Sequence, residues 1–308
     1  MGELLPFPVG VRAGRTVPLP RAEAMAAALD RLEDYRVLRR LEPYPAGPLT
    51  HYDPTATRVG CAIDVETSGL DYETDAVIEL CVQRFRLDDE WNVVEVDAPY
   101  SWLEDPGRPL APEIVRITRL DDLDLVGERI DDALAAAIIG SADFVVAHNA
   151  GFDRPFVERR LPTIAGMPWA CSLTDVDWRA SGREGRTLAQ LLAHEGWFHT
   201  AHRAEADVLA LIRLLGSGID ANRTVLDALL ANAVRPTWLI SASGAPFAAQ
   251  AALKARRYRW NASARCWERE MRGEEVDGER AWLADRVYEG VGRPLMRKVT
   301  WRERYATR

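Results

Sequence analysis

The 308-residue sequence lacks the features that mark membrane, secreted and metal–thiolate proteins. Its longest uncharged stretch, residues 236–253, contains prolines, a glycine and several hydroxyl side chains, which favours a buried part of a domain over a membrane span. The N-terminus has no apolar core of signal-peptide length, and Pro6 stands where a myristoylation signal needs Ser or Thr. The four cysteines form no Cys-x-x-Cys pair. This excludes a zinc site and predicts reduced, mostly buried thiols in a cytoplasmic protein.

The sequence also lacks internal repeats, low-complexity segments and an even distribution of charge. Residues 1–57 contain 7 basic and 7 acidic side chains, residues 58–249 contain 17 and 31, and residues 250–308 contain 15 and 9. The net charge of −8 is therefore the sum of 0, −14 and +6. The basic C-terminal region either meets a polyanion or presents a solvated surface, and charge alone leaves both readings open.

Periodicity divides the chain into three parts. Residues 1–57 predict an N-terminal helical segment, with a helix over 21–41 followed by a Pro-, Gly- and Tyr-rich linker. Residues 58–235 predict one α/β domain, and residues 236–308 predict a small basic C-terminal α/β domain. A composition with 47% hydrophobic and 28% charged residues is sufficient for such cores.

The central part begins with three strand-like runs and continues with alternating helices and strands. The runs at 58–66, 76–87 and 91–103 are separated by turn residues, which predicts a meander. A helix, a buried strand and two further helices follow near residues 130–139, 143–148, 152 onward and 204–215. This order predicts a mixed sheet with helices packed on it.

The C-terminal part has its own alternation of elements. Strands are expected at 237–243 and 295–305, helices at 246–257 and 278–290, and a hairpin around Asn261–Ser263.

Two acids, Asp64 and Glu66, end the apolar run "CAIDVE". Residues two apart on a strand point to the same face, so these carboxylates would repel each other and lose solvation. Either a positive group offsets that cost, or the strand ends at Asp64 and leaves both acids in solvent.

Further candidates lie in two later segments. "VVAHNAGFD" places Asp153 just after a buried strand, and "HTAHRAEAD" places His202 before an apolar helix that carries Asp207 early in its course. Four carboxylates and one histidine from three segments fit a site for two hard divalent cations, which can promote phosphodiester hydrolysis.

The segments "DVETSGL", "HNAGFD" and "HRAEAD" resemble the three Exo motifs of the DnaQ-like 3′–5′ exonucleases, in the His-containing subgroup called DEDDh. The resemblance covers residues 58–215, and it implies a ribonuclease H-like fold with a mixed five-stranded sheet flanked by helices. It implies two Mg²⁺ or Mn²⁺ ions held by four carboxylates, and His202 as the general base. The implied metal ligands are Asp64, Glu66, Asp153 and Asp207.

The same motifs imply residues that bind the substrate. Thr67, Ser68 and Gly69 would hold the terminal 3′-hydroxyl, and Leu70 would wedge against the last base. Asn149 and Phe152 would position the end of the strand. His148 is expected to have a structural role in its turn, and His194 and His199, outside the motifs, to have surface or packing roles.

The resemblance implies a phosphodiester hydrolase that removes nucleotides from the 3′ end of DNA, with a single-stranded 3′ end as its partner. Three alternatives remain open: trimming of RNA, non-catalytic binding of strand ends, and service as a proofreading subunit. Non-catalytic binding would predict loss of at least one of the five site residues, and all five are present. No segment resembles a polymerase-clamp peptide. A polymerase partner or a homodimer stays open, but the sequence does not indicate either.

The C-terminal part combines arginines with aromatic residues in "ARRYRWNASARCW". Aromatic rings stack on bases and arginines pair with phosphates, which suits single-strand binding. The candidate nucleic-acid contacts are Arg257, Tyr258, Arg259, Trp260 and Trp267. The alternative is that Tyr258 and Trp260 face the core of the small domain.

Overall fold

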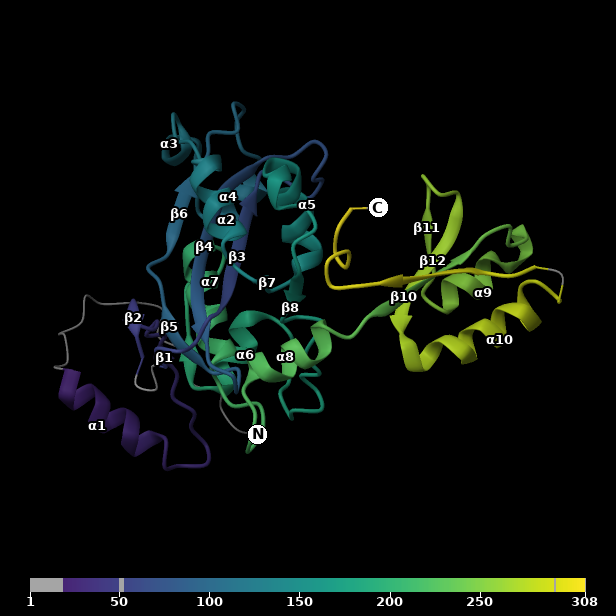
Figure 1. Ribbon diagram of the computed structural model, residues 1–308. Helices are drawn as coiled ribbons and strands as arrows, with labels where there is room; N and C mark the ends of the chain where they lie inside the picture. The colour runs from purple at the N-terminus through teal and green to yellow at the C-terminus, as the bar shows by residue number, and fades with distance from the viewer. Residues whose placement is uncertain (1–18, 50–52, 291, 308) are drawn as a thin grey trace, which may run out of the picture.

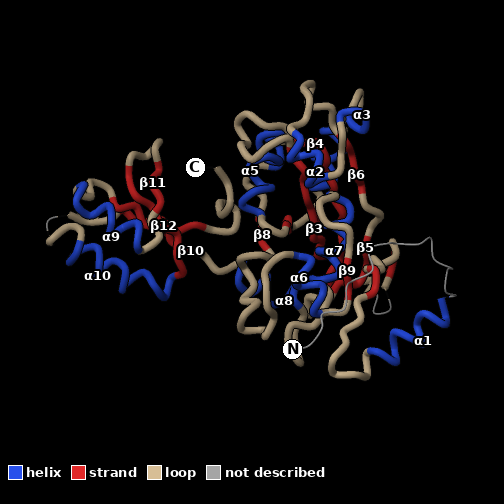
Figure 2. Tube along the Cα trace, turned by 180° about the vertical axis from the view of Figure 1, so that it is seen from behind, coloured by secondary structure: helices blue, strands red, loops and turns tan. Residues whose placement is uncertain are grey.

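The computed structural model of the protein describes residues 19–49, 53–290 and 292–307. A larger α/β body and a smaller four-stranded sheet with its own helices lie side by side (Figures 1 and 2). No helix within the described ranges is long and apolar enough to cross a membrane.

The body is organised around a mixed sheet. Three strands form an antiparallel meander, and two more continue the sheet parallel to β3 in the order β5-β4-β3-β7-β8. Two short strands extend it, because β2 pairs with β5 and β6 pairs with β4. The strands are β2 (Gly47–Pro48), β3 (Arg58–Thr67), β4 (Val77–Leu87), β5 (Val93–Val96), β6 (Tyr100–Leu103), β7 (Phe144–Ala147) and β8 (Trp169–Cys171).

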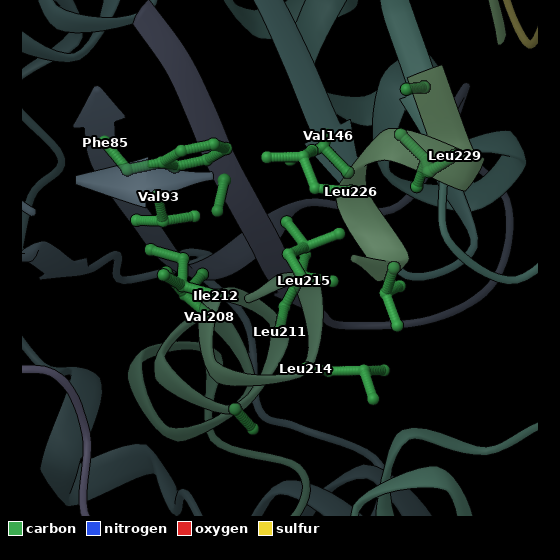
Figure 3. Close-up of a cluster of buried hydrophobic side chains, with 14 of the residues drawn as sticks. Phe85, Val93, Val146, Val208, Leu211, Ile212, Leu214, Leu215, Leu226 and Leu229 are labelled. Carbon is green, nitrogen blue, oxygen red and sulfur yellow. The ribbon is translucent and has the colours of Figure 1, made fainter. Parts of the chain in front are cut away.

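Helices cover both faces of this sheet, so its central strands are apolar on both sides. Successive side chains of a strand point to opposite faces of the sheet. Val146 of β7 therefore packs with α7 and α8, whereas Val145 packs with α4 and α5 on the other face. Figure 3 shows Leu211 and Leu215 of α7 facing Val146 and Leu226. The helices of the body are α2 (Pro112–Thr118), α3 (Asp122–Leu125), α4 (Asp132–Gly140), α5 (Ala150–Arg160), α6 (Leu188–His194), α7 (Ala204–Leu215) and α8 (Val225–Ala233).

The predicted α/β class and mixed sheet are confirmed, and the described residues contribute seven strands to the sheet where five were expected. One extra strand arises because the run expected at 91–103 breaks into β5 and β6 around Pro99, which has no N–H to donate. The other is β2, which lies in the segment that was expected to be linker.

The N-terminal helix is shorter than the predicted 21–41. Helix α1 spans Leu19–Leu29, and the chain then turns. β1 (Arg39–Arg40) runs parallel to β9 (Trp197–Phe198) at the edge of the body. This pairing with a distant segment outweighs the helix propensity of residues 30–41.

The C-terminal sheet is antiparallel, in the order β11-β12-β10-β13. Two helices pack on one face around Ile240, Leu253 and Leu283. The elements are β10 (Thr237–Ala242), α9 (Gln250–Ala255), β11 (Arg259–Asn261), β12 (Cys266–Arg272), α10 (Val276–Arg286) and β13 (Leu295–Val299). A 3-10 turn, Phe247–Ala249, precedes α9 and replaces the expected first turn of that helix.

The last strand ends at Val299 rather than at 305, because the chain turns back onto the body. Trp301 packs against the body core and stacks on Phe144, with ring centroids 6.2 Å apart. The division into 1–57, 58–235 and 236–308 remains our proposal, and residues 300–307 cross it.

Candidate active site

The first two acids stand near the end of β3, where the sheet is irregular. The strand continues to Thr67, so it does not end at Asp64, and both carboxylates are half-buried. A β-bulge between Glu66 and Thr67 shifts the pairing with β4 at this point. Bulges often redirect side chains next to functional sites.

The other two acids come from the first turns of α5 and α7. One oxygen atom from each of Asp64, Glu66 and Asp207 lies within 4.8 Å of the others. Asp153 is only 2% exposed, and its Oδ1 accepts a hydrogen bond of 3.3 Å from the backbone N–H of Val65, between the two acids of β3. The fold therefore gathers the four carboxylates from three segments that are distant in the sequence.

Burial and mutual repulsion make it unfavourable for all the carboxyl groups of this cluster to be ionised together. Burial, followed by repulsion from Asp153 and Asp207, holds the pKa of Asp64 well above its usual range. Burial is also the largest cause that raises the pKa of Glu66 and of Asp153, each to about 8. In the described ranges, none of these three acids has an ion pair with Lys or Arg. Carboxylates gathered in this way are stabilised in their charged form by a nearby cation.

His202 is held by its backbone and not by its ring. Its N–H donates a hydrogen bond of 2.8 Å to Oδ2 of Asp207, and its φ of 64° is left-handed. The residue is exposed and lines the same cleft as the acids, so the imidazole can reach into the site while its backbone stays fixed.

A cleft of about 520 Å³ is lined by seven of the eleven site residues predicted from the three motifs. The predicted residues that line it are Asp64, Glu66, Asn149, Phe152, Asp153, His202 and Asp207. Asn149 precedes α5 with a left-handed φ of 97°.

Thr67, the last residue of β3, and the loop after it lie outside that lining. Thr67 donates its hydroxyl hydrogen bond to the carbonyl of Gly69 at 2.5 Å, and Ser68 Oγ bonds Ala76 N–H and Arg108. The side chain of Leu70 is 85% exposed.

Comparison with known proteins identifies the fold around this cleft. The family model described as "Exonuclease" matches residues 61–215, about half of the chain. The chain belongs to the exonuclease family. This exonuclease is 30% identical over 164 residues to DNA polymerase III subunit epsilon of Treponema pallidum (strain Nichols), which covers 50% of the chain and 73% of that protein. It is 29% identical over 113 residues to Ribonuclease T of Shewanella sp. (strain ANA-3), which covers 32% of the chain and half of that protein.

Solved exonuclease structures resemble the chain more distantly. Exonuclease X in complex with 5′ overhanging duplex DNA aligns with 55% of the chain and 99% of its own, at 21% identity and a TM-score of 0.39. E. coli Exonuclease I in complex with a dA16 oligonucleotide aligns with 60% of the chain and 48% of its own, at 19% identity and a TM-score of 0.44. The family consists of 3′–5′ exonucleases that depend on divalent metals, and the acidic cluster of this exonuclease fits that chemistry.

Sequence reasoning missed His199, for which a surface or packing role was expected. Its ring Nε2 lies 2.7 Å from Oδ1 of Asp207, and its side chain is only 3% exposed. Its Nδ1 has no hydrogen-bond partner among the described residues. The pattern His-x-x-His just before the Asp207 helix was the available signal.

Glu79 was also missed, and it holds the start of α7. Its carboxylate is 1% exposed and accepts hydrogen bonds from Arg203 at 3.1–3.3 Å and from Ala204 N–H at 3.2 Å. It faces Glu66 across the β3–β4 pair. An acid inside the apolar run "AVIELCV" was the signal for it.

The remaining histidines have structural contacts. His148 lies 2.8 Å from Ser172 Oγ through Nδ1 and 2.9 Å from the carbonyl of Arg186 through Nε2, and burial lowers its pKa. This fits the expected role in the turn. His194 Nε2 lies 3.0 Å from the backbone N and O of Glu184.

One expected C-terminal contact is contradicted by its burial. Tyr258 is 3% exposed and belongs to the core of the small sheet, so its ring cannot stack on a base. Trp260 is 53% exposed, which leaves it available.

Proposed function

We propose that this exonuclease removes nucleotides from the 3′ end of DNA with two Mg²⁺ or Mn²⁺ ions in the acidic cleft. The observation that supports this is the convergence of Asp64, Glu66 and Asp207, beside buried Asp153, without a Lys or Arg partner for the two β3 acids among the described residues. Four carboxylates so arranged are costly unless a cation joins them.

The donor set fits hard divalent cations. Carboxylate oxygens are the ligands that Mg²⁺ and Mn²⁺ prefer, and the proposed ligands are Asp64, Glu66, Asp153 and Asp207. Such ions, when bound, supply activation of water and stabilisation of the leaving oxygen in phosphodiester hydrolysis.

The chain's own residues would supply the proton transfer and the positioning. His202, exposed in the cleft and anchored through its backbone, takes the proton of the attacking water as general base. Asn149 and Phe152 position the end of the strand from the start of α5.

The loop after β3 would receive the terminal nucleotide. Because the Thr67 and Ser68 hydroxyls already have partners in the loop, its backbone, including Gly69, holds the 3′-hydroxyl in our proposal. Leu70, 85% exposed, wedges against the last base.

DNA is the proposed substrate because of the match to the DNA polymerase III subunit epsilon. The chain covers 73% of that protein, which is more than it covers of Ribonuclease T. RNA is the second candidate, since a segment of 113 residues is 29% identical to a protein named Ribonuclease T.

The test is degradation of 5′-labelled single-stranded DNA, duplex DNA and RNA of one sequence, compared side by side. Shortening of 5′-labelled strands one nucleotide at a time is expected, fastest on DNA. Asp207→Asn, purified in the same way, is the inactive variant for comparison. Faster loss of RNA would reverse the substrate assignment, and activity that survives Asp207→Asn would remove the active site from this cleft.

A further inference from the structure

One stretch of the C-terminal sheet and its first helix has a one-sided charge distribution. Residues 236–267 contain five cations and no acid, in a chain whose net charge is −8. The five are Lys254, Arg256, Arg257, Arg259 and Arg265. They fall on the end of α9 and on the β11–β12 hairpin, and β11 is the edge strand of the sheet.

Most of these cations are not neutralised by the fold. Only Arg256 has an ion-pair partner in the described ranges, the buried carboxylate of Glu279. Arg257, Arg259 and Arg265 are exposed and have no acidic partner within those ranges. Exposed arginines without an ion-pair partner raise the local positive potential.

The acids that face this edge have other hydrogen-bond partners. Glu268, directly across from Arg259, accepts hydrogen bonds of 2.9 Å from Ser241 and from Asn261. Glu270 accepts a hydrogen bond from Thr237 and lies 3.7 Å from Arg304. The donors to Glu268 are neutral and leave its charge in place, and both acids line one pocket with Arg257 and Arg259. The five cations therefore outnumber the two acids at this edge but are partly offset by them.

An exposed indole lies on the same edge strand. Because neighbouring residues of a strand point to opposite faces, it projects from the face opposite to Arg259. Trp260 of β11 is 53% exposed and meets Trp267 edge to face, with ring centroids 5.6 Å apart. Lys254 lies over the Trp267 ring, 5.7 Å from its centroid. The Trp260 ring is thus supported from one side and open to solvent over much of its surface.

We propose that this edge, the β11 surface (Lys254, Arg257, Arg259, Trp260 and Arg265), binds a single-stranded nucleic acid at a distance from the cleft, with arginines on phosphates and a base on Trp260. This inference rests on the proposed function. A body of net −14 repels a polyanion, so the affinity for a long strand has to come from a surface of opposite charge. The exposed indole favours a single strand over a duplex, whose bases are already stacked.

The test measures strand binding without cleavage. In an Asp64→Asn background, anisotropy of a labelled 20-nucleotide DNA is followed against salt for Arg257→Ala/Arg259→Ala/Arg265→Ala. The expected result is a tenfold or greater loss of affinity and a fall in the slope of log K against log salt of about 2, at about 0.7 for each phosphate contact. Trp260→Ala should weaken single-strand binding at least about fivefold and leave duplex binding unchanged.

The matched control removes the same charge elsewhere. Arg116→Ala/Arg223→Ala/Arg280→Ala deletes three exposed arginines that each pair with an acid three residues away, so it should leave the slope unchanged. The three β11 arginine changes are also made with Asp64 intact. In that variant the rate of dinucleotide cleavage should fall by a smaller factor than the affinity for the long strand.

Two results would overturn the inference: an unchanged slope in the β11 variant, or equal losses in the β11 and control variants. Binding of an acidic peptide in preference to DNA would reassign the surface to a protein partner. The proposed function is judged separately, by whether the chain with Asp64 intact shortens DNA at all.

Discussion

Arg154 Nη1 donates a hydrogen bond of 2.6 Å to the backbone carbonyl of Arg304, 150 residues away. The side chain of Arg154 is 1% exposed, and its Nη2 donates to the carbonyl of Arg302, also at 2.6 Å. Arg154 directly follows Asp153 on α5. The C-terminal segment is therefore bound to the helix that carries a proposed metal ligand.

The segment is held from the other side as well. Arg304 donates to the carboxylate of Asp175 at 3.2 Å and to the carbonyl of Ala233 at 3.1 Å. Tyr305 donates to Asp175 at 3.0 Å. These contacts tie residues 300–307 to the core of the exonuclease body.

Arg154→Met should destabilise the protein, because it leaves buried carbonyls without donors at about 1–3 kcal/mol each. We expect the melting temperature to fall by about 2–4 °C for each kcal/mol lost. Since α5 also carries Asp153, Mn²⁺ affinity measured by calorimetry should fall too. Arg116→Met, at an exposed site, is the control. Unchanged Mn²⁺ affinity in a destabilised variant would make the contact purely structural.

Asp64→Asn, Asp153→Asn and Asp207→Asn should each abolish nuclease activity with the fold intact, because each removes a proposed metal ligand. Mg²⁺ or Mn²⁺ should support cleavage, whereas Ca²⁺, which is larger and less strict in geometry, should support binding with little cleavage. Asp89→Asn, whose side chain is 94% exposed, is the matched control. Full activity after EDTA treatment would contradict the metal proposal.

His202→Ala should lower the rate of cleavage by about 100-fold or more, the usual scale for loss of a general base. Mn²⁺ and strand affinity should change far less, since the imidazole is not a proposed ligand. Single-turnover kinetics and calorimetry on the same samples separate the two effects. Loss of Mn²⁺ binding in this variant would instead make His202 a ligand or a structural residue.

His199→Ala should weaken Mn²⁺ binding, because the ring holds Oδ1 of Asp207 at 2.7 Å. Loss of a partner that orients a metal ligand typically costs about 10–100-fold in affinity. His199→Gln retains an N–H donor and should therefore keep part of the Mn²⁺ affinity that His199→Ala loses. Equal affinities in both variants and the unaltered protein would show that Asp207 does not depend on this contact.

The metal-free protein should become less stable as pH rises. The pKa values of Glu66 and Asp153 are raised in the folded state to about 8, so the folded state binds more protons than the unfolded chain above about pH 4. Their contribution to stability is complete below that pH and is lost as pH rises through about 8.

Melting temperatures in EDTA at about pH 6 and pH 9 measure this effect. Asp153→Asn, whose side chain cannot ionise, should reduce the difference in melting temperature between the two pH values. Saturating Mg²⁺ should reduce the same difference in the unaltered chain. A difference that is the same in Asp153→Asn and the unaltered chain would place the pH dependence elsewhere.

The sequence by itself determined the central fold and the acidic cluster. Strands β3, β4 and β7 were predictable because each is a local apolar run between turn residues, and local patterns specify local elements. Asp64, Glu66, Asp153 and Asp207 were predictable because three short motifs carry them in a fixed order.

Only the tertiary structure decided the contacts between distant segments. The end of α1 at Leu29, the burial of Tyr258, the bond from His199 to Asp207 and the grip of Arg154 on the C-terminal carbonyls all depend on which surfaces meet after folding. Propensity and periodicity describe how a segment behaves along its own length. Which partner it meets is set by the packing of the whole chain, and that packing is non-local.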